Sequence, residues 1–372
     1  MKKVLYIFGT RPEAIKMAPL ILDMSRSSAF EVKVCVTGQH RSMLDQVLKF
    51  FDIVPDYDLA IMRHGQTLGD ITSGAIKGLS SVLSNDYDPD FVVVQGDTST
   101  AFAGALAGFY SKKKVVHIEA GLRSQNKFSP FPEEMNRLLI SRLADIHFAP
   151  TPQACANLLN EGISEDDVFN VGNTAIDALY LGLDKLNTNG RVDIGNRFPF
   201  LSEGGRPILV TGHRRENFGA PMENICYALK AIVENNADVQ IIYPVHLNPN
   251  VMEPVRRILG GSDRIHLTEP LDYPYLIWLL NRSYLVVTDS GGIQEEAPAL
   301  GKPVIVMRDV TERVEGIAAG TAVLVGTNKE KIVSKCQQLL TDHTEYEKMA
   351  KSINPYGDGE ASRRITSILR TK

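Results

Sequence analysis

The sequence predicts an α/β protein with two doubly wound parallel sheets. Short runs rich in Val, Ile and Phe, such as Phe91–Asp97, recur along the chain. They are apolar at successive positions, as expected for parallel strands covered on both faces. Amphipathic segments such as Ala14–Ser25 separate most of them, and this alternation is typical of βαβ units. The series occurs once in each half of 372 residues, a length that favours two domains.

The runs place the strands and helices of both domains. In the first half the predicted strands are Val4–Gly9, Val32–Gly38, Phe91–Asp97, Val115–Gly121, Ile146–Thr151 and Val168–Asn173. In the second half they are Pro207–His213, Val239–His246, Arg264–Pro270, Tyr284–Gly292, Pro303–Asp309 and Ala322–Gly326. Further helices are expected at Met222–Asn235, Ile293–Leu300 and about Ala361–Leu369. We predict two Rossmann-like domains that face each other, residues 1–172 with a returning C-terminal helix at about 358–372, and residues 173–357.

Composition excludes several classes of function. The chain has 40 Lys and Arg against 44 Asp and Glu, a net charge of −4, so no broad basic surface for nucleic acid is expected. No apolar segment approaches the length of a membrane span. The apolar run Val4–Phe8 is too short for a signal peptide and is followed by Arg11 and Glu13. We expect a cytoplasmic protein that binds neither nucleic acid nor membrane.

Cysteine and histidine spacing predicts no metal site. The four cysteines, Cys35, Cys155, Cys226 and Cys336, are far apart and form no CxxC pair. They suit buried thiols in a reducing compartment better than disulfides or zinc ligands. The eight histidines show neither HxxxH nor HExxH spacing.

Polar residues collect where the predicted strands end. They are Gly9–Arg11, Gly96–Thr98, Glu119–Gly121, Gly212–Arg214 and Asp289–Gly292. Ligands bind outside the carboxyl ends of strands in open parallel sheets. Turns alone also favour Gly, Asp, Ser and Thr, but they do not explain Arg11, Glu119 and His213 at the same edge. We therefore expect a shared ligand site.

The strongest local motif is Thr288–Val306. A strand ends, Ser290, Gly291 and Gly292 form a turn, and a helix follows. Backbone N–H groups at a helix start attract phosphate, and Glu296, about one turn further, can reach the ribose of a nucleotide. An ordinary capped helix is the alternative. Neither GxGxxG nor GxxxxGK[ST] occurs, which disfavours a nicotinamide dinucleotide or Walker-type ATP site.

Basic side chains follow other strand ends. Arg11 is suited to a phosphate oxygen, whereas Lys16 either joins that site or is an ordinary solvated helix lysine. His213 lies in an unusually polar segment, and it can steady a departing phosphate or supply its proton. Arg313 lies in a loop after the fifth strand of the second half.

Three carboxylates are candidates for acid–base chemistry, which needs a base and often an acid held at different positions. Asp97 and Glu119 end predicted strands, and Glu133 lies in a Pro-rich segment. Asp97 could instead cap the following helix, and Glu133 could favour the first turn of one. Glu119, which is followed by Ala-Gly, has the weakest structural alternative.

The motifs carry a family resemblance. They are FGTRPEAIKMAP, GDTST, HIEAGLRS, SPFPEEMNR, VGNTAIDAL, GHRREN, YPVHLNPNV, TDSGGIQEEAP and NPYGDGEASRR. Together they resemble the non-hydrolysing bacterial UDP-N-acetylglucosamine 2-epimerases over essentially the full length. The resemblance implies the glycosyltransferase-B architecture, in which two Rossmann-like domains border a deep cleft.

Residue roles follow from the resemblance, motif by motif. The implied catalytic residues are Asp97, Glu119, Glu133 and His213. The implied contacts to the UDP-sugar are Arg11, Lys16, Asp97, Glu119, His213, Ser290, Gly291, Gly292, Glu296 and Arg313. Leu271 and Leu276 take positions near the uracil where relatives often have Gln and Phe. Gln39, His40 and Gln66 fit a site at which many relatives bind a second substrate molecule as activator.

The resemblance also implies a reaction. A carboxylate removes the C2 proton of UDP-N-acetylglucosamine while UDP leaves C1, which gives a 2-acetamidoglucal. UDP then adds back, and a proton returns to the opposite face of C2. No metal or redox cofactor is required. A homodimer and a role in supplying envelope polysaccharide or capsule precursors are implied as well.

Four other functions stay open on the sequence. They are a hydrolysing 2-epimerase, an epimerase of a modified UDP-aminosugar, a glycosyltransferase of the same architecture and a non-catalytic nucleotide-sugar sensor. The three carboxylates disfavour the glycosyltransferase, and together with His213 they disfavour the sensor.

Overall fold

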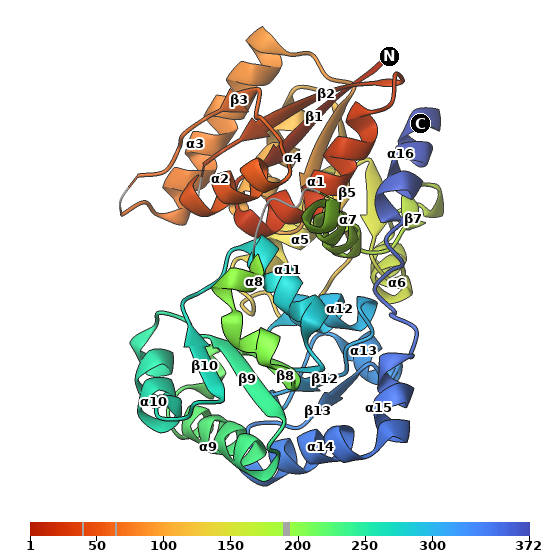
Figure 1. Ribbon diagram of the computed structural model, residues 1–372. Coiled ribbons are helices and arrows are strands. Elements are labelled where there is room, and N and C mark those ends of the chain that lie inside the picture. Colours follow the sequence, from red (N-terminus) through yellow and green to blue (C-terminus); the bar gives the residue numbers. More distant parts are fainter. Residues whose placement is uncertain (39–40, 64, 189–193) are drawn as a thin grey trace. The chain divides into compact units, whose positions relative to one another are not determined.

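The computed structural model describes residues 1–38, 41–63, 65–188 and 194–372 (Figure 1). The chain divides into two compact units, residues 1–181 with 357–372 and residues 182–356. The boundary expected between residues 172 and 173 precedes helix α7 (Thr174–Thr188), whereas the division lies inside that helix. Among the described residues, no helix is long and apolar enough to cross a membrane.

Unit 1 is built on a seven-stranded sheet in the order β3-β2-β1-β4-β5-β6-β7. Its strands are β1 (Lys2–Phe8), β2 (Phe30–Val36), β3 (Tyr57–Asp58), β4 (Phe91–Gln95), β5 (Lys114–Ile118), β6 (Ile146–Ala149) and β7 (Val168–Asn170). All the neighbouring pairs run parallel. Apolar runs in the sequence predicted all of them but β3, which has only two residues and gives no such run. From β1, successive strands are added toward one edge of the sheet as far as β3 and then, from β4 on, toward the other edge. The strand order therefore reverses between β1 and β4.

Unit 2 carries a six-stranded parallel sheet in the order β10-β9-β8-β11-β12-β13. Its strands are β8 (Arg206–Thr211), β9 (Val239–Pro244), β10 (Ile265–Thr268), β11 (Leu285–Thr288), β12 (Val304–Val306) and β13 (Ala322–Leu324). Each corresponds to a predicted run. In this sheet the strand order reverses between β8 and β11. The prediction of an α/β protein with two parallel sheets is therefore confirmed.

Helices cover the sheets (Figure 1). In unit 1 they are α1 (Arg11–Ser25), α2 (Arg41–Phe50), α3 (Leu68–Ser81), η1 (Val82–Asp86), α4 (Ser99–Tyr110), α5 (Glu133–Leu143), α6 (Pro152–Asn160), η2 (Glu165–Asp167) and α16 (Ala361–Thr371). In unit 2 they are α8 (Ile194–Arg197), η3 (Pro199–Glu203), η4 (Arg215–Asn217), α9 (Ala220–Asn235), α10 (Pro249–Leu259), α11 (Tyr273–Arg282), α12 (Gly291–Ala299), α13 (Val314–Ala318), α14 (Lys329–Thr341) and α15 (His343–Ala350). In unit 1, α3, α4 and α5 pack together, while α1 packs against α2 and α16.

Small residues let α4 lie close to the sheet of unit 1. A Cβ at Gly104 would lie 2.8 Å from Cγ1 of Val94, and one at Gly108 would lie 3.0 Å from Cγ2 of Val115. Both glycines are therefore required by the close approach of helix and sheet. Because α4 follows β4 directly, this packing also fixes the turn that carries Asp97.

Two buried histidines face each other across neighbouring strands. His117 of β5 and His147 of β6 are paired in the register of the sheet, and Nε2 of His117 lies 2.8 Å from the carbonyl oxygen of Gly96. Burial lowers the pKa of His117 to about 3 and that of His147 to about 4, from an ordinary 6.5. Both rings are therefore neutral in the folded protein at neutral pH.

This depression of the pKa predicts a loss of stability in mild acid. Below about pH 6.5 these two histidines bind protons in the unfolded chain but remain unprotonated in the folded chain. The free energy of unfolding therefore falls as pH drops from 6.5 toward 4. Each histidine contributes up to ~1.4 kcal/mol per pH unit. Urea unfolding of His147→Gln should show a shallower fall over this range. The exposed His343→Gln control should keep the wild-type slope, and an unchanged slope in His147→Gln would contradict the account.

Candidate functional site

Both sheets bring the predicted site residues to the point where the strand order reverses. Gly9–Arg11 follows β1 and Gly96–Thr98 follows β4 in unit 1, whereas Gly212–Arg214 follows β8 and Asp289–Gly292 follows β11 in unit 2. In doubly wound sheets, such a switch point opens a crevice in which ligands bind.

The end of β1 needs glycine and a buried carboxylate. A Cβ at Gly9 would lie 2.2 Å from Oγ1 of Thr37. Glu13, which burial gives a raised pKa, accepts the N–H groups of Gly9 and Thr10 at 3.1 and 2.8 Å and the hydroxyl of Thr98 at 2.6 Å. It therefore ties the start of α1 to the start of α4. The α1 start carries Arg11, whose guanidinium has no hydrogen-bond or ion-pair partner among the described residues.

Asp97 is held by α5 rather than used as a helix cap. The N-cap of α4 is Thr98, whose hydroxyl accepts the N–H of Ala101, so the capping alternative for Asp97 is wrong. Oδ2 of Asp97 pairs with Nη2 of Arg137 at 2.6 Å, and its backbone oxygen accepts the amide of Asn136 at 2.7 Å. Arg137 belongs to the motif SPFPEEMNR, but nothing in the sequence marks it as the partner of Asp97.

Glu119 is the most constrained of the three carboxylates. It has a left-handed φ of +63°, and its Oε1 lies 2.5 Å from Nζ of Lys16. The side-chain amide of Gln95 donates to Oε2. Lys16 is therefore not merely a solvated helix lysine. Gln95 was missed because it lies inside an apolar strand run, where only its polar side chain hints at a role.

Glu133 is the first residue of α5, and its Oε2 is buried without a hydrogen-bond partner among the described residues. Its neighbour Glu134 is fully engaged, since it accepts the N–H groups of Ser124 and Gln125 and pairs with Arg137. Of the two adjacent glutamates, Glu134 fixes the loop and Glu133 keeps an unsatisfied oxygen.

In unit 2, Asp289 holds the segment that carries His213. Its Oδ2 accepts the backbone N–H groups of His213 and Arg214, each at 2.9 Å. The His213 ring stacks on His246 at 5.6 Å between centroids. Burial lowers the pKa of His213, the Asp289 carboxylate opposes this effect, and His246 and Arg214 add to it.

The start of α12 has the form expected of an anion site. Ser290 is the N-cap residue but makes no side-chain capping bond. The Arg313 guanidinium carbon lies 3.4 Å from where a Cβ of Gly291 would be, and Nε of Arg313 donates to Glu295 at 2.7 Å. A Cβ at Gly292 would meet no heavy atom of the described chain within 4 Å. The Arg313 guanidinium, which is paired with Glu295, therefore lies beside the start of α12. The first backbone N–H groups of a helix lack intrahelical partners and attract anions.

The remaining predicted residues occupy varied positions. Glu296 lies buried on α12, Leu271 is buried just before α11, and Leu276 is half-buried on α11. The amide of Gln66 is used within its own loop, where it donates to Ile61 and accepts from the N–H of Arg63. Gln39 and His40 lie outside the described residues.

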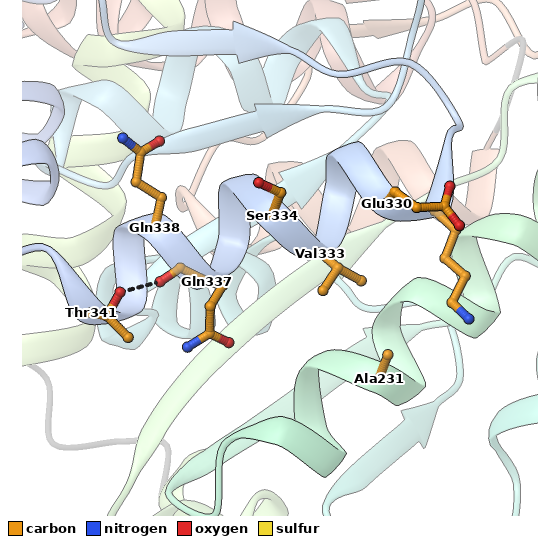
Figure 2. A pocket seen from close by; sticks show the side chains of 8 residues that line it. Ala231, Glu330, Val333, Ser334, Gln337, Gln338 and Thr341 are labelled. Atoms are coloured by element: carbon orange, nitrogen blue, oxygen red, sulfur yellow. Dashed lines mark hydrogen bonds between the residues drawn. The ribbon is translucent and has the colours of Figure 1, made fainter.

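Two other features carry no site assignment. Across the described ranges, no group of three or more His, Cys, Asp or Glu side chains is arranged to hold a metal ion. Figure 2 shows an open groove between α9 and α14, lined by Ala231, Lys329, Glu330, Val333, Ser334, Gln337, Gln338 and Thr341. None of the predicted site residues lines it.

Comparison with known proteins identifies the family of the chain. The model of the family "UDP-N-acetylglucosamine 2-epimerase" matches residues 22–370. The UDP-N-acetylglucosamine 2-epimerases of Yersinia pestis and Bacillus subtilis are each 54% identical, over 99% of this chain and 98% and 94% of theirs. The crystal structure of UDP-GlcNAc 2-epimerase from Neisseria meningitidis bound to UDP-GlcNAc is 48% identical, with a TM-score of 0.91 over 100% of both chains. The chain therefore belongs to the UDP-N-acetylglucosamine 2-epimerase family of isomerases, as its motifs indicated.

Proposed function

We propose that this protein reversibly epimerises C2 of UDP-N-acetylglucosamine to give UDP-N-acetylmannosamine, without net hydrolysis. Family membership and the ligand of the Neisseria relative support the substrate. The observation that carries the proposal is the set of three carboxylates, each held differently. Asp97 is paired with Arg137, Glu119 with Lys16 and Gln95, and Glu133 keeps an unpartnered oxygen.

The proposed reaction breaks and remakes two bonds. A carboxylate takes the C2 proton as the C1–O bond to UDP breaks, and the electron pair of the C–H bond forms the C1–C2 double bond of 2-acetamidoglucal. In the second half, a UDP oxygen adds back to C1 and a proton is delivered to the opposite face of C2. Opposite faces require separate proton carriers, and Asp97, Glu119 and Glu133 are the proposed carriers.

The cationic groups have a different proposed task. Loss of UDP leaves negative charge on the diphosphate, which fixed N–H groups and cations stabilise better than mobile water. We assign this role to His213, Arg313 and the Ser290–Gly292 helix start in unit 2, with Arg11 as a further cation. Glu296, Leu271 and Leu276 are the proposed contacts to the nucleoside, and Lys16 is proposed to act through Glu119.

Solvent exchange tests the reaction. The pure protein is incubated with UDP-N-acetylglucosamine in D₂O and followed by NMR. We expect deuterium at C2 and the appearance of UDP-N-acetylmannosamine. Free N-acetylmannosamine as the main stable product would indicate a hydrolysing enzyme. Absence of exchange, even with an added acceptor or a second equivalent of substrate, would exclude this substrate and leave a modified UDP-aminosugar or a glycosyltransferase reaction.

The wider setting is part of the same proposal. We infer a cytoplasmic homodimer that uses UDP-N-acetylglucosamine and UDP as its small-molecule partners and supplies precursors of envelope polysaccharide or capsule. We also propose activation by a second substrate molecule at Gln39, His40 and Gln66. Sigmoidal dependence of the initial rate on substrate concentration would support this activation, and a hyperbolic dependence would exclude it.

Gly292→Ala separates phosphate binding from folding. Alanine should be accepted at this helical position, because its Cβ meets open space and its helix propensity exceeds that of glycine by up to ~1 kcal/mol. The same methyl group would obstruct a phosphate at the helix start, so the Kd for UDP should rise about tenfold, equivalent to ~1.4 kcal/mol. Calorimetric titration with UDP and thermal melting measure the two effects.

Gly261→Ala is the matched control, because its Cβ also meets no heavy atom of the described residues within 4 Å. It should leave the affinity for UDP unchanged. Equal affinity of Gly292→Ala and the wild type for UDP would remove the helix start from the proposed diphosphate site.

A further inference from the structure

We propose that Asp289 is a positioning residue for His213, and that it fixes the proton of the neutral imidazole on Nδ1 and leaves Nε2 to face the ligand. This inference rests on the proposed function, in which His213 acts on the diphosphate. It concerns unit 2 alone, since both residues lie at the switch point of its sheet.

One oxygen of Asp289 holds the segment that follows β8. Oδ2 accepts the N–H groups of His213 and Arg214 at 2.9 Å and the side-chain amide of Asn217 at 3.1 Å. The carboxylate is completely buried. Three donors on one oxygen fix the start of the segment after β8, and with it the Cα and Cβ of His213.

The other oxygen faces the imidazole. Oδ1 of Asp289 has no hydrogen-bond partner among the described residues, and it lies 3.5 Å from Nδ1 of His213. A buried acceptor without a donor is energetically unfavourable. Nδ1–H of His213 can satisfy it after a small rotation of the ring, whereas an unprotonated Nδ1 would set two lone pairs against each other. The geometry therefore selects the tautomer that carries its proton on Nδ1.

The other groups around the ring do not compete for this role. His246 stacks on His213, and its Nδ1 accepts the N–H of Asn248 at 3.1 Å. Arg214 is the further charged neighbour, and it acts together with burial to lower the pKa of His213. A neutral ring is thus favoured in the free protein, and in a neutral ring the tautomer decides which nitrogen meets a ligand. When a diphosphate binds, Nε2 can take up a proton and donate it in a hydrogen bond, while Asp289 stabilises the charge formed at Nδ1.

Nitrogen NMR of the full-length protein tests the tautomer directly. Protein labelled with ¹⁵N-histidine is measured without ligand and with saturating UDP, and His213→Gln identifies the His213 signals. In the wild type we expect Nδ1 protonated and Nε2 unprotonated before UDP is added, and both protonated afterwards. A free wild type with its proton on Nε2 overturns the proposal without any variant being needed.

Asp289→Asn adds the decisive comparison. The asparagine oxygen can keep the bonds to the two backbone N–H groups, but its NH₂ then faces Nδ1 and demands an acceptor there. The free protein should switch its proton to Nε2, and UDP should no longer bring a second proton. The kcat should fall at least about a hundredfold, with KM changed less than about threefold. An unchanged tautomer in Asp289→Asn overturns the proposal.

Asn217→Ala is the control for a merely structural effect. It removes a hydrogen bond from the same carboxylate but leaves Oδ1 of Asp289 beside Nδ1 of His213. The tautomer of His213 in this variant should therefore match that in the wild type. Failure of the proposed function is recognised separately, because a wild type that exchanges no deuterium at C2 can still show the expected spectra without substrate.

Discussion

Glu119→Gln should lower kcat for C2 epimerisation by a factor of about 10²–10⁴, the usual contribution of a positioned acid or base. Both oxygens of Glu119 are engaged, one with Lys16 and one with Gln95, so the side chain is presented in one orientation. An amide cannot take or return a proton, and its NH₂ would face either the Lys16 ammonium or the Gln95 amide. The variant should therefore lose both the chemistry and the orientation.

The measurement is deuterium incorporation at C2, run beside calorimetric titration with UDP and thermal melting. Binding of UDP should change little, because the residues proposed to hold the diphosphate lie mainly in unit 2. Asp86→Asn, at an exposed carboxylate near the end of η1, should retain wild-type activity. More than a tenth of the wild-type exchange rate in Glu119→Gln would remove Glu119 from the proton-transfer steps.

The strands could be predicted because each carries its own signal. A buried parallel strand is apolar at every position, so the runs around Val4, Phe91 and Val304 mark their strands without knowledge of any partner. The strand β3 (Tyr57–Asp58) is too short to give such a signal. The division between the two units also gives no signal in the sequence, because it lies inside α7. A helix that runs from one unit into the next has no break in its hydrophobic pattern.

The site was predictable as a set of strand ends but not as a set of contacts. Strand ends reveal Asp97, Glu119 and His213, since polar residues there interrupt apolar runs. The partners come from distant segments, such as Lys16 for Glu119 and Arg137 for Asp97, and no spacing in the chain records such pairs. Asp289 illustrates the same limit, because the sequence marks it only as a polar residue at a strand end, whereas in the structure it holds the segment of His213.

The backbone that presents Glu119 depends on the glycine two positions later, and Gly121→Ala should destabilise the protein by about 2–5 kcal/mol. Gly121 has a φ of +89°, and a Cβ there would lie 2.1 Å from the carbonyl oxygen of Ala154 in α6. The left-handed backbone alone costs a residue with a side chain roughly 1–2 kcal/mol. Overlap with a fixed backbone oxygen adds about 1–3 kcal/mol more, because neither the strand nor the helix can move away freely.

Gly162→Ala isolates the two contributions. Gly162 follows the same helix and has a similar φ of +82°, but a Cβ there would meet no described atom within 4 Å. It should therefore cost only the roughly 1–2 kcal/mol of the backbone conformation. Urea unfolding of both variants measures the difference, which equals the overlap with Ala154. Equal losses would mean that α6 yields to the added methyl group, and the backbone at Glu119 would then not depend on the packing of Gly121 against α6.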